Sequence, residues 1–174
     1  DAGVCSSEDS VSIAVRPELT TSISSDTIMC YGESYGLLAT GGYFYDWTPS
    51  SGLSASNISD PTASPTTTTE YAVVIEDSAY GCMAYDTVLI TVNSVDIGVT
   101  DSSPVLIAND STAIYQWLYC DSNYAIISGQ TSQTFTATAN GNYAVEVSQN
   151  NCTDTSACVS VVFVDIIEIS VLST

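Results

Sequence analysis

The chain has 174 residues, 45% of them apolar, which is enough for one or two domains with hydrophobic cores. Charged residues make up only 12%, the net charge is −19, Arg16 is the single basic residue, and there is no histidine or lysine. Nucleic acids and anionic lipids are bound through Lys and Arg, so this composition excludes nucleic-acid binding and argues against an anionic membrane surface as a partner.

The cysteines and the lengths of the apolar runs indicate where the protein is located. Six cysteines in a Ser- and Thr-rich acidic chain predict disulfides and an extracellular or cell-surface location. The sequence contains no CxxC pair, and the absence of histidine excludes mixed Cys/His zinc sites. No run approaches the ~20 apolar residues of a membrane helix, so we expect no membrane insertion. We see no signal peptide and expect any export signal to have been removed or to lie outside this segment.

Residues 1–16 match the last strand of a longer unit. Both Cys5–Val15 and Cys82–Val92 read Cys-x3-Asp-[Ser/Thr]-Val-x-Ile-x-Val, with the aliphatic residues alternating on one face. Two explanations stay open. The segment is either the terminal strand of a preceding repeat in a tandem array, or a donor strand that completes a sandwich in a neighbouring subunit.

The first complete domain is expected over 17–94, because Pro17 interrupts ladder pairing. Short alternating segments separated by Gly, Pro, Asn and Ser predict a β-sandwich with Trp47 in its core. The expected strands are 19–24, 34–40, 43–47, 70–76 and 87–92.

A second β-sandwich is expected over 95–166, with Trp117 on its central strand and Tyr143 as a further core residue. Its expected strands are 105–108, 113–119, 125–129, 131–136, 141–147 and 158–164. Residues 167–174 continue an apolar tail that is a linker or an extra strand. The predicted fold class is therefore all-β, with two tandem Ig-like antiparallel sandwiches preceded by one strand.

The motifs of residues 18–93 are familiar as a block. They run Cys-x-Gly, Trp-Thr-Pro, Gly-Leu-Ser, Pro-Thr-Ala-Ser-Pro-Thr-Thr-Thr, Gly-Cys and Asp-Thr-Val. This block resembles the Ig-like/PKD-like repeats of Bacteroidota surface proteins, which are exported by type IX secretion and are often adhesins. The second domain, with Tyr-Gln-Trp and Asn-Gly-x-Tyr-x-Val-x-Val, resembles another Ig-like module. The resemblance implies a secreted, cell-surface module and no particular activity.

Disulfide pairing is predicted as follows. Cys30 and Cys82 are the only cysteines of the first domain and are expected to pair. Cys152 and Cys158 flank Thr-Asp-Thr-Ser-Ala and are expected to close the last hairpin, which leaves Cys120 free or linked to Cys5.

The residue types limit the chemistry. Without His and Lys there is no Ser-His-Asp triad, Cys-His pair or Schiff base, and no carboxylate pair sits in a recognisable motif. We therefore predict no enzyme and no catalytic residues. Calcium is the candidate ion because it takes hard oxygen ligands, although the pattern favours solvated loop carboxylates over a metal site. The candidate ligands are Asp46, Asp60, Glu76, Asp77, Asp121 and Asp154.

Two surface functions depend on the resemblance and on the aromatic residues. Strand alternation predicts Tyr43, Tyr45 and Trp47 in the core and Phe44 on the opposite face, and any exposed aromatic platform would suit surface glycans. Bacteroidota O-glycosylate Asp-[Ser/Thr]-[small or aliphatic], whereas Asp-Ser and Asp-Thr are also ordinary turn residues. The matching positions are Ser10, Thr27, Ser78, Thr87 and Ser111.

These observations favour a non-enzymatic extracellular structural or adhesive module, part of a cell-surface stalk, filament or adhesin. Its expected partners are neighbouring repeats or subunits of the same protein. Two alternatives stay open: a filament subunit that polymerises by strand donation, and a carbohydrate-binding accessory module of a secreted enzyme.

Overall fold

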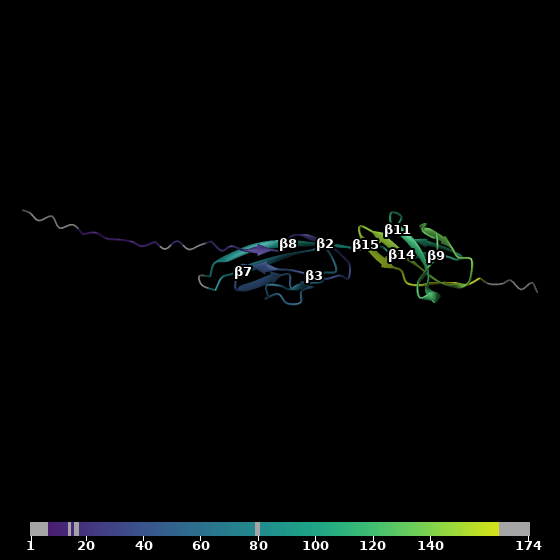
Figure 1. The fold of residues 1–174 in the computed structure, drawn as a ribbon, viewed down its shortest axis with the longest axis horizontal. Helices are drawn as coiled ribbons and strands as arrows, with labels where there is room; N and C mark the ends of the chain where they lie inside the picture. The colour runs from purple at the N-terminus through teal and green to yellow at the C-terminus, as the bar shows by residue number, and fades with distance from the viewer. Residues whose placement is uncertain (1–6, 14, 16–17, 79–80, 164–174) are drawn as a thin grey trace, which may run out of the picture.

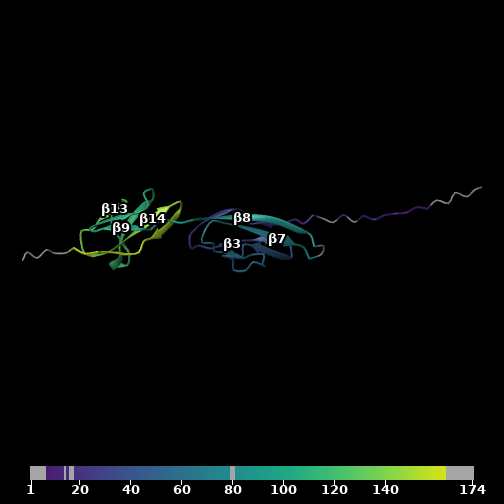
Figure 2. The ribbon, with the colours of Figure 1, turned by 180° about the vertical axis from the view of Figure 1, so that it is seen from behind.

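The structure is a computed structural model that describes residues 7–13, 15, 18–78 and 81–163. It is all-β, as predicted, and consists of two β-sandwiches placed end to end (Figure 1). The view from behind shows the same separation into two bodies (Figure 2). No helix in the described part is long and apolar enough to cross a membrane.

The first sandwich has one four-stranded sheet, in the order β2-β8-β7-β5, and a second layer made of the short pairs β1-β4 and β3-β6. The central pair β7-β8 is long because Tyr-Ala-Val-Val-Ile and Val-Leu-Ile-Thr-Val alternate over most of their length. The strands are β1 (Ser22–Ile23), β2 (Thr27–Cys30), β3 (Tyr35–Gly36), β4 (Ala39–Thr40), β5 (Phe44–Thr48), β6 (Thr62–Ala63), β7 (Thr69–Glu76) and β8 (Met83–Asn93).

Strand β2 departs from the prediction in two ways. No strand was predicted at these residues, and β2 runs parallel to β8, with Thr27 opposite Ile90 and Cys30 opposite Asn93. The other described strand pairs are antiparallel, as predicted, and this edge is the exception. A four-residue strand carries little periodic signal, and a parallel partner some 60 residues away leaves no local hairpin signature.

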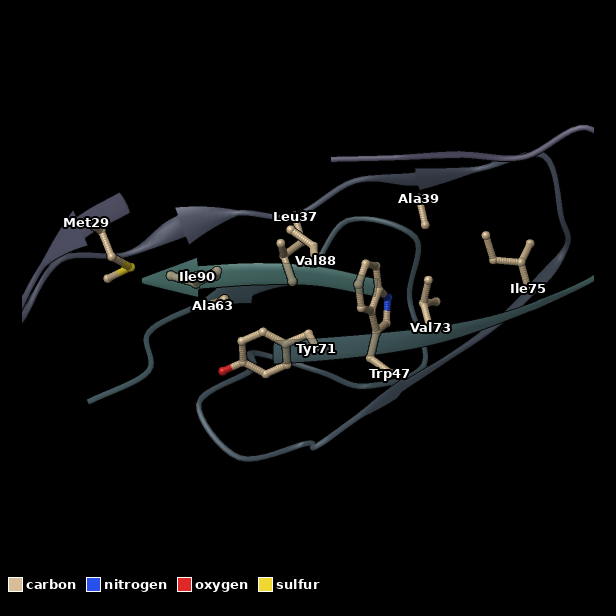
Figure 3. Close-up of a cluster of buried hydrophobic side chains, with 10 residues drawn as sticks. All are labelled: Met29, Leu37, Ala39, Trp47, Ala63, Tyr71, Val73, Ile75, Val88 and Ile90. Atoms are coloured by element: carbon tan, nitrogen blue, oxygen red, sulfur yellow. The ribbon is translucent and has the colours of Figure 1, made fainter. Parts of the chain in front are cut away.

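The first core lies between the two layers and is centred on Trp47, as predicted (Figure 3). The Trp47 ring is 1% exposed, and its Nε1 donates a hydrogen bond to the Ile58 carbonyl at 2.9 Å. A buried indole N–H needs such a partner. The buried members are Met29, Leu37, Ala39, Trp47, Ala63, Tyr71, Val73, Ile75, Val88 and Ile90.

The second sandwich packs a three-stranded sheet, in the order β13-β10-β9, against a sheet in the order β12-β11-β14-β15, in which β16 also pairs with β14. The elements are β9 (Val99–Ser102), β10 (Val105–Ala108), β11 (Ile114–Tyr119), the 3₁₀ turn η1 (Cys120–Ser122), β12 (Ala125–Ile126), β13 (Thr134–Thr136), β14 (Gly141–Gln149), β15 (Cys152–Thr155) and β16 (Val159–Val161).

Aromatic rings form the centre of the second core. Trp117 stacks on Phe135 with ring centroids 5.2 Å apart, and Phe135 contacts Tyr143 at 5.1 Å. The Trp117 Nε1 donates to the Ser132 carbonyl at 2.9 Å. The Tyr143 hydroxyl donates to the Ala139 carbonyl at 2.8 Å, which is the tyrosine-corner arrangement of Ig-like folds. Trp117 and Tyr143 are thus core residues, as predicted.

The described residues before the first sandwich form no strand. Val11, Ile13 and Val15 are 86%, 80% and 90% exposed, so the apolar face of this segment contacts nothing in the described chain. Its assignment to a repeat end or a donor strand stays a prediction, as do the expected domain boundaries. The expected linker at 167–174, and Cys5, lie outside the described residues.

Candidate functional site

A disulfide between Cys30 and Cys152 joins the two sandwiches, with Cα atoms 5.5 Å apart. Cys30 is the last residue of β2, and Cys152 is the first residue of β15. Figure 1 shows these two strands facing each other where the sandwiches meet. This cross-junction disulfide is the candidate functional site, because it determines how one sandwich is held against the other.

The β14-β15 hairpin presents Cys152 to the first sandwich. Asn150 and Asn151 have φ values of 52° and 63°, which defines a two-residue type I′ turn between Gln149 and Cys152. Asn adopts this left-handed conformation more readily than most residues, and the turn matches the twist of the strands. Cys152 is therefore held at the tip of a tight hairpin.

Cys30 is fixed by its own turn. Its backbone N–H donates to the Glu33 side chain at 2.8 Å, and its carbonyl accepts from the Glu33 N–H at 3.1 Å, with Gly32 in the left-handed region. The Asn93 carbonyl accepts a hydrogen bond from the Tyr31 N–H at 2.8 Å. The Asn93 Nδ2 donates a longer hydrogen bond, of 3.4 Å, to the Asn150 carbonyl across the junction.

A crevice of about 510 Å³ beside the disulfide is lined by residues of both sandwiches, among them Met29, Asn93 and Asn151. The two bodies are thus incompletely packed at this point. The disulfide links the two sandwiches covalently beside this crevice.

Both predicted cysteine pairings are wrong. Cys30 lies beside Asn93, whereas Cys82 precedes the other end of β8, so they are separated by about ten residues of strand, roughly 35 Å. A disulfide needs Cα atoms closer than about 7 Å. Cys82 is a free, partly buried cysteine.

Cys152 and Cys158 do not close a hairpin, because residues 152–155 form β15 rather than a turn. The chain between the two cysteines runs back along β14, from Gln149 to the neighbourhood of Tyr143, which separates them by roughly 20 Å. Cys158 instead bonds to Cys120, which was expected to be free or linked to Cys5.

The Cys120–Cys158 disulfide lies next to a carboxylate clamp. Asp121 accepts hydrogen bonds from the Asn142 backbone N–H at 3.0 Å and from its Nδ2 at 2.7 Å. These two bonds hold the pKa of Asp121 below its usual value, and burial followed by the nearby Asp121 charge raises the pKa of Tyr119. The clamp joins η1 to β14.

The calcium candidates are dispersed. No three of the acidic or cysteine side chains in the described part form a metal-binding group. Both oxygens of Asp121 are already hydrogen-bonded, Asp77 accepts from the Gly81 N–H at 3.0 Å, and Asp60 from the Ser59 hydroxyl at 3.3 Å. Asp46 is exposed on β5. Calcium binding therefore stays an expectation.

The matches to the glycosylation motif are at the surface. Ser10, Ser78, Thr87 and Ser111 are exposed, and Thr27 is partly buried. Modification of these hydroxyls stays a prediction.

Two aspartates of the glycosylation motifs accept hydrogen bonds from backbone N–H groups of β8. Asp26 Oδ1 accepts from the Leu89 N–H at 2.9 Å, and Asp86 Oδ1 accepts from the Thr87 N–H at 2.8 Å. Among the described strands, β2 pairs with only the last four residues of β8 along one edge of that strand. The two carboxylates accept hydrogen bonds from N–H groups of β8 that β2 does not reach.

An aromatic group is exposed on the first sandwich. Tyr43 was expected in the core but is 70% exposed, because it precedes β5 and its ring packs edge-on against Phe44. Trp47 and Tyr45 contribute to the core as predicted, and Phe44 points outward. Phe44 shares the outer face of the sheet with Met83 and with Tyr85, which is 72% exposed.

Comparison with known proteins gives fold-level likeness only. No family model matches the sequence, and no curated protein matches it. Among solved structures, extracellular domains 3–5 of Drosophila OTK are 10% identical, with a TM-score of 0.41, and the match covers 82% of this chain and 61% of that one.

Two further structures are similar at the same level. Titin domains Z1Z2 in complex with telethonin are 11% identical, with a TM-score of 0.33, over 81% of this chain and 94% of that one. The fibronectin(III)-like modules of Clostridium thermocellum CbhA are 14% identical, with a TM-score of 0.33, over 82% and 92%. The description of two Ig-like sandwiches accordingly depends on the strand topology, the buried tryptophans and the tyrosine corner.

Proposed function

We propose that the chain is a non-enzymatic structural or adhesive segment of an extracellular stalk, filament or adhesin. The observation that carries this proposal is the Cys30–Cys152 disulfide, which fixes two sandwiches end to end. Disulfides persist in oxidising compartments, and a bond between domains maintains their geometry rather than forming a binding pocket. The neighbours of such a segment are further repeats or subunits of the same protein.

Immunogold electron microscopy of the producing cells tests this role, with antibody raised against the folded chain. We expect label on intact cells, along stalks or filaments that project from the surface. Label found only after permeabilisation would contradict the proposal.

The exposed stripe of Val11, Ile13 and Val15 favours strand donation as a second candidate. An unpaired apolar alternation is stabilised by adding to another sheet. If the segment is donated, Val11→Asp/Ile13→Asp abolishes concentration-dependent association in sedimentation velocity, while Ser10→Asp/Ser12→Asp, with the same added charge on the other face, retains it. Equal association of the two variants would exclude donation through this face.

The exposed Tyr43, Phe44 and Tyr85 favour glycan binding as a third candidate, since aromatic rings stack on the apolar faces of sugars. On a glycan array, Phe44→Ala/Tyr85→Ala is expected to lose any binding that the unmodified chain shows. Tyr31→Ala, at another exposed ring, serves as the control. An array without any bound glycan would exclude this candidate.

A further inference from the structure

The position of the cross-junction disulfide determines how tension would pass through the molecule. In Figure 1 the first described residues and the end of the second sandwich lie at opposite ends of the elongated chain, and β2 and β15 meet between them. A stalk segment is pulled along this direction. A force applied before β1 is transmitted along the chain to Cys30, where the disulfide connects it directly to Cys152.

We propose that the Cys30–Cys152 disulfide is a tension shunt, which carries load directly from one sandwich to the other and keeps the intervening chain out of the load path. The two cysteines are 122 residues apart in sequence, and everything between them becomes a closed loop. This inference rests on the proposed structural role of the chain.

The loop contains most of the elements that form both cores. Strands β5, β7 and β8, with Trp47, lie inside it, as do β10, β11 and β14, with Trp117. Folded domains are only marginally stable, by about 5–15 kcal/mol, so a pull that passed through these strands would unfold them well before it broke a covalent bond. With the shunt in place, these strands lie outside the covalent load path, whereas the core residues Met29 on β2 and Val161 on β16 remain in it.

Four of the described strands remain in the load path. These are β1 and β2 before Cys30, and β15 and β16 from Cys152 onward. The Cys120–Cys158 disulfide cannot replace the shunt, because it spans only 38 residues and lies within the second sandwich.

Single-molecule stretching of the whole chain tests the proposal, with handles joined enzymatically at the two ends so that no thiol is added. Fully extended residues span about 3.3–3.6 Å each. The unmodified chain keeps the 122 residues between Cys30 and Cys152 inside a closed loop that cannot be extended. In Cys30→Ser/Cys152→Ser only the 38 residues between Cys120 and Cys158 stay inside a closed loop. The fully extended length of this variant is therefore expected to exceed that of the unmodified chain by roughly 280–300 Å.

The matched control is Cys120→Ser/Cys158→Ser, which also removes one disulfide. Its extended length is expected to equal that of the unmodified chain, because the shunt still hides the longer loop. Dithiothreitol is expected to lengthen the unmodified chain by roughly 400–440 Å, the full 122 residues.

Equal extension of the oxidised chain and Cys30→Ser/Cys152→Ser would overturn the shunt. So would a greater length in the Cys120→Ser/Cys158→Ser control. These results would leave the cell-surface role standing, since immunogold labelling tests that role without reference to the disulfide. Intracellular label alone would reject the cell-surface role and leave the measured load path unchanged.

Discussion

At the scale of single residues, the tyrosine corner offers a direct test. Tyr143→Phe removes the hydroxyl that donates to the Ala139 carbonyl, a part-buried hydrogen bond, and keeps the ring in the core. We expect a loss of about 0.5–1.5 kcal/mol in the free energy of unfolding, measured by urea denaturation of the second sandwich. Tyr85→Phe, at an exposed ring, is the control and should change nothing. An unchanged urea midpoint for Tyr143→Phe would show that the bond contributes nothing.

The Asp121 clamp gives a second residue-scale prediction. A carboxyl whose pKa is lower in the folded than in the unfolded state stabilises the fold above the unfolded pKa, and this contribution is lost as pH falls through the folded pKa. An NMR titration should therefore place the pKa of Asp121 below the usual value of an aspartate. Asn142→Ala removes the side-chain donor and should move the pKa upward. A midpoint in that variant equal to the original would refute the assigned cause.

At the scale of elements, the free edge of β8 is the sensitive feature. Asp26→Ala/Asp86→Ala leaves the Leu89 and Thr87 N–H groups without their carboxylates. An open edge with unpaired donors is a template for another strand, so we expect faster aggregation on mild heating, followed by light scattering. Asp46→Ala, with half the charge change, should aggregate at about the original rate. The same acceleration in both variants would attribute the effect to lost charge rather than to the edge.

The same scale shows how far the sequence could be interpreted. The alternation of apolar and polar residues predicted β8, which contains Val88 and Ile90, and β11, which contains Tyr115 and Trp117. In a half-buried strand every second side chain faces the core, and this gives the sequence its period of two. It missed β15, because Thr-Asp-Thr has turn-like composition and forms a strand only through its pairing with β14. Disulfide connectivity depends on which strand ends meet in space, and the sequence holds no local signal for that. Cys152 was therefore paired within its own sandwich rather than across the junction.

For the whole molecule, the dominant property is an unbalanced charge of −19. Like-charge repulsion opposes the compact state, and salt screens it, with a Debye length that falls from about 30 Å at 0.01 M to about 3 Å at 1 M. We expect sodium chloride to raise the unfolding temperature at pH 7. At pH 2.5, where most carboxylates are protonated, the salt dependence should largely disappear. A salt effect of equal size at both pH values would indicate a cause other than charge screening.

The cross-junction disulfide also has a consequence for biogenesis. In the folded chain its two sulfur atoms are brought together by β2 and the β14-β15 hairpin, one from each sandwich, so folding of both sandwiches favours this bond over other pairings. During synthesis Cys30 emerges long before Cys152, and Cys82 and Cys120 emerge between them. A chain oxidised as it emerges meets these wrong partners first. Correct maturation therefore requires that oxidation wait for folding, or that an isomerase reshuffle the early bonds.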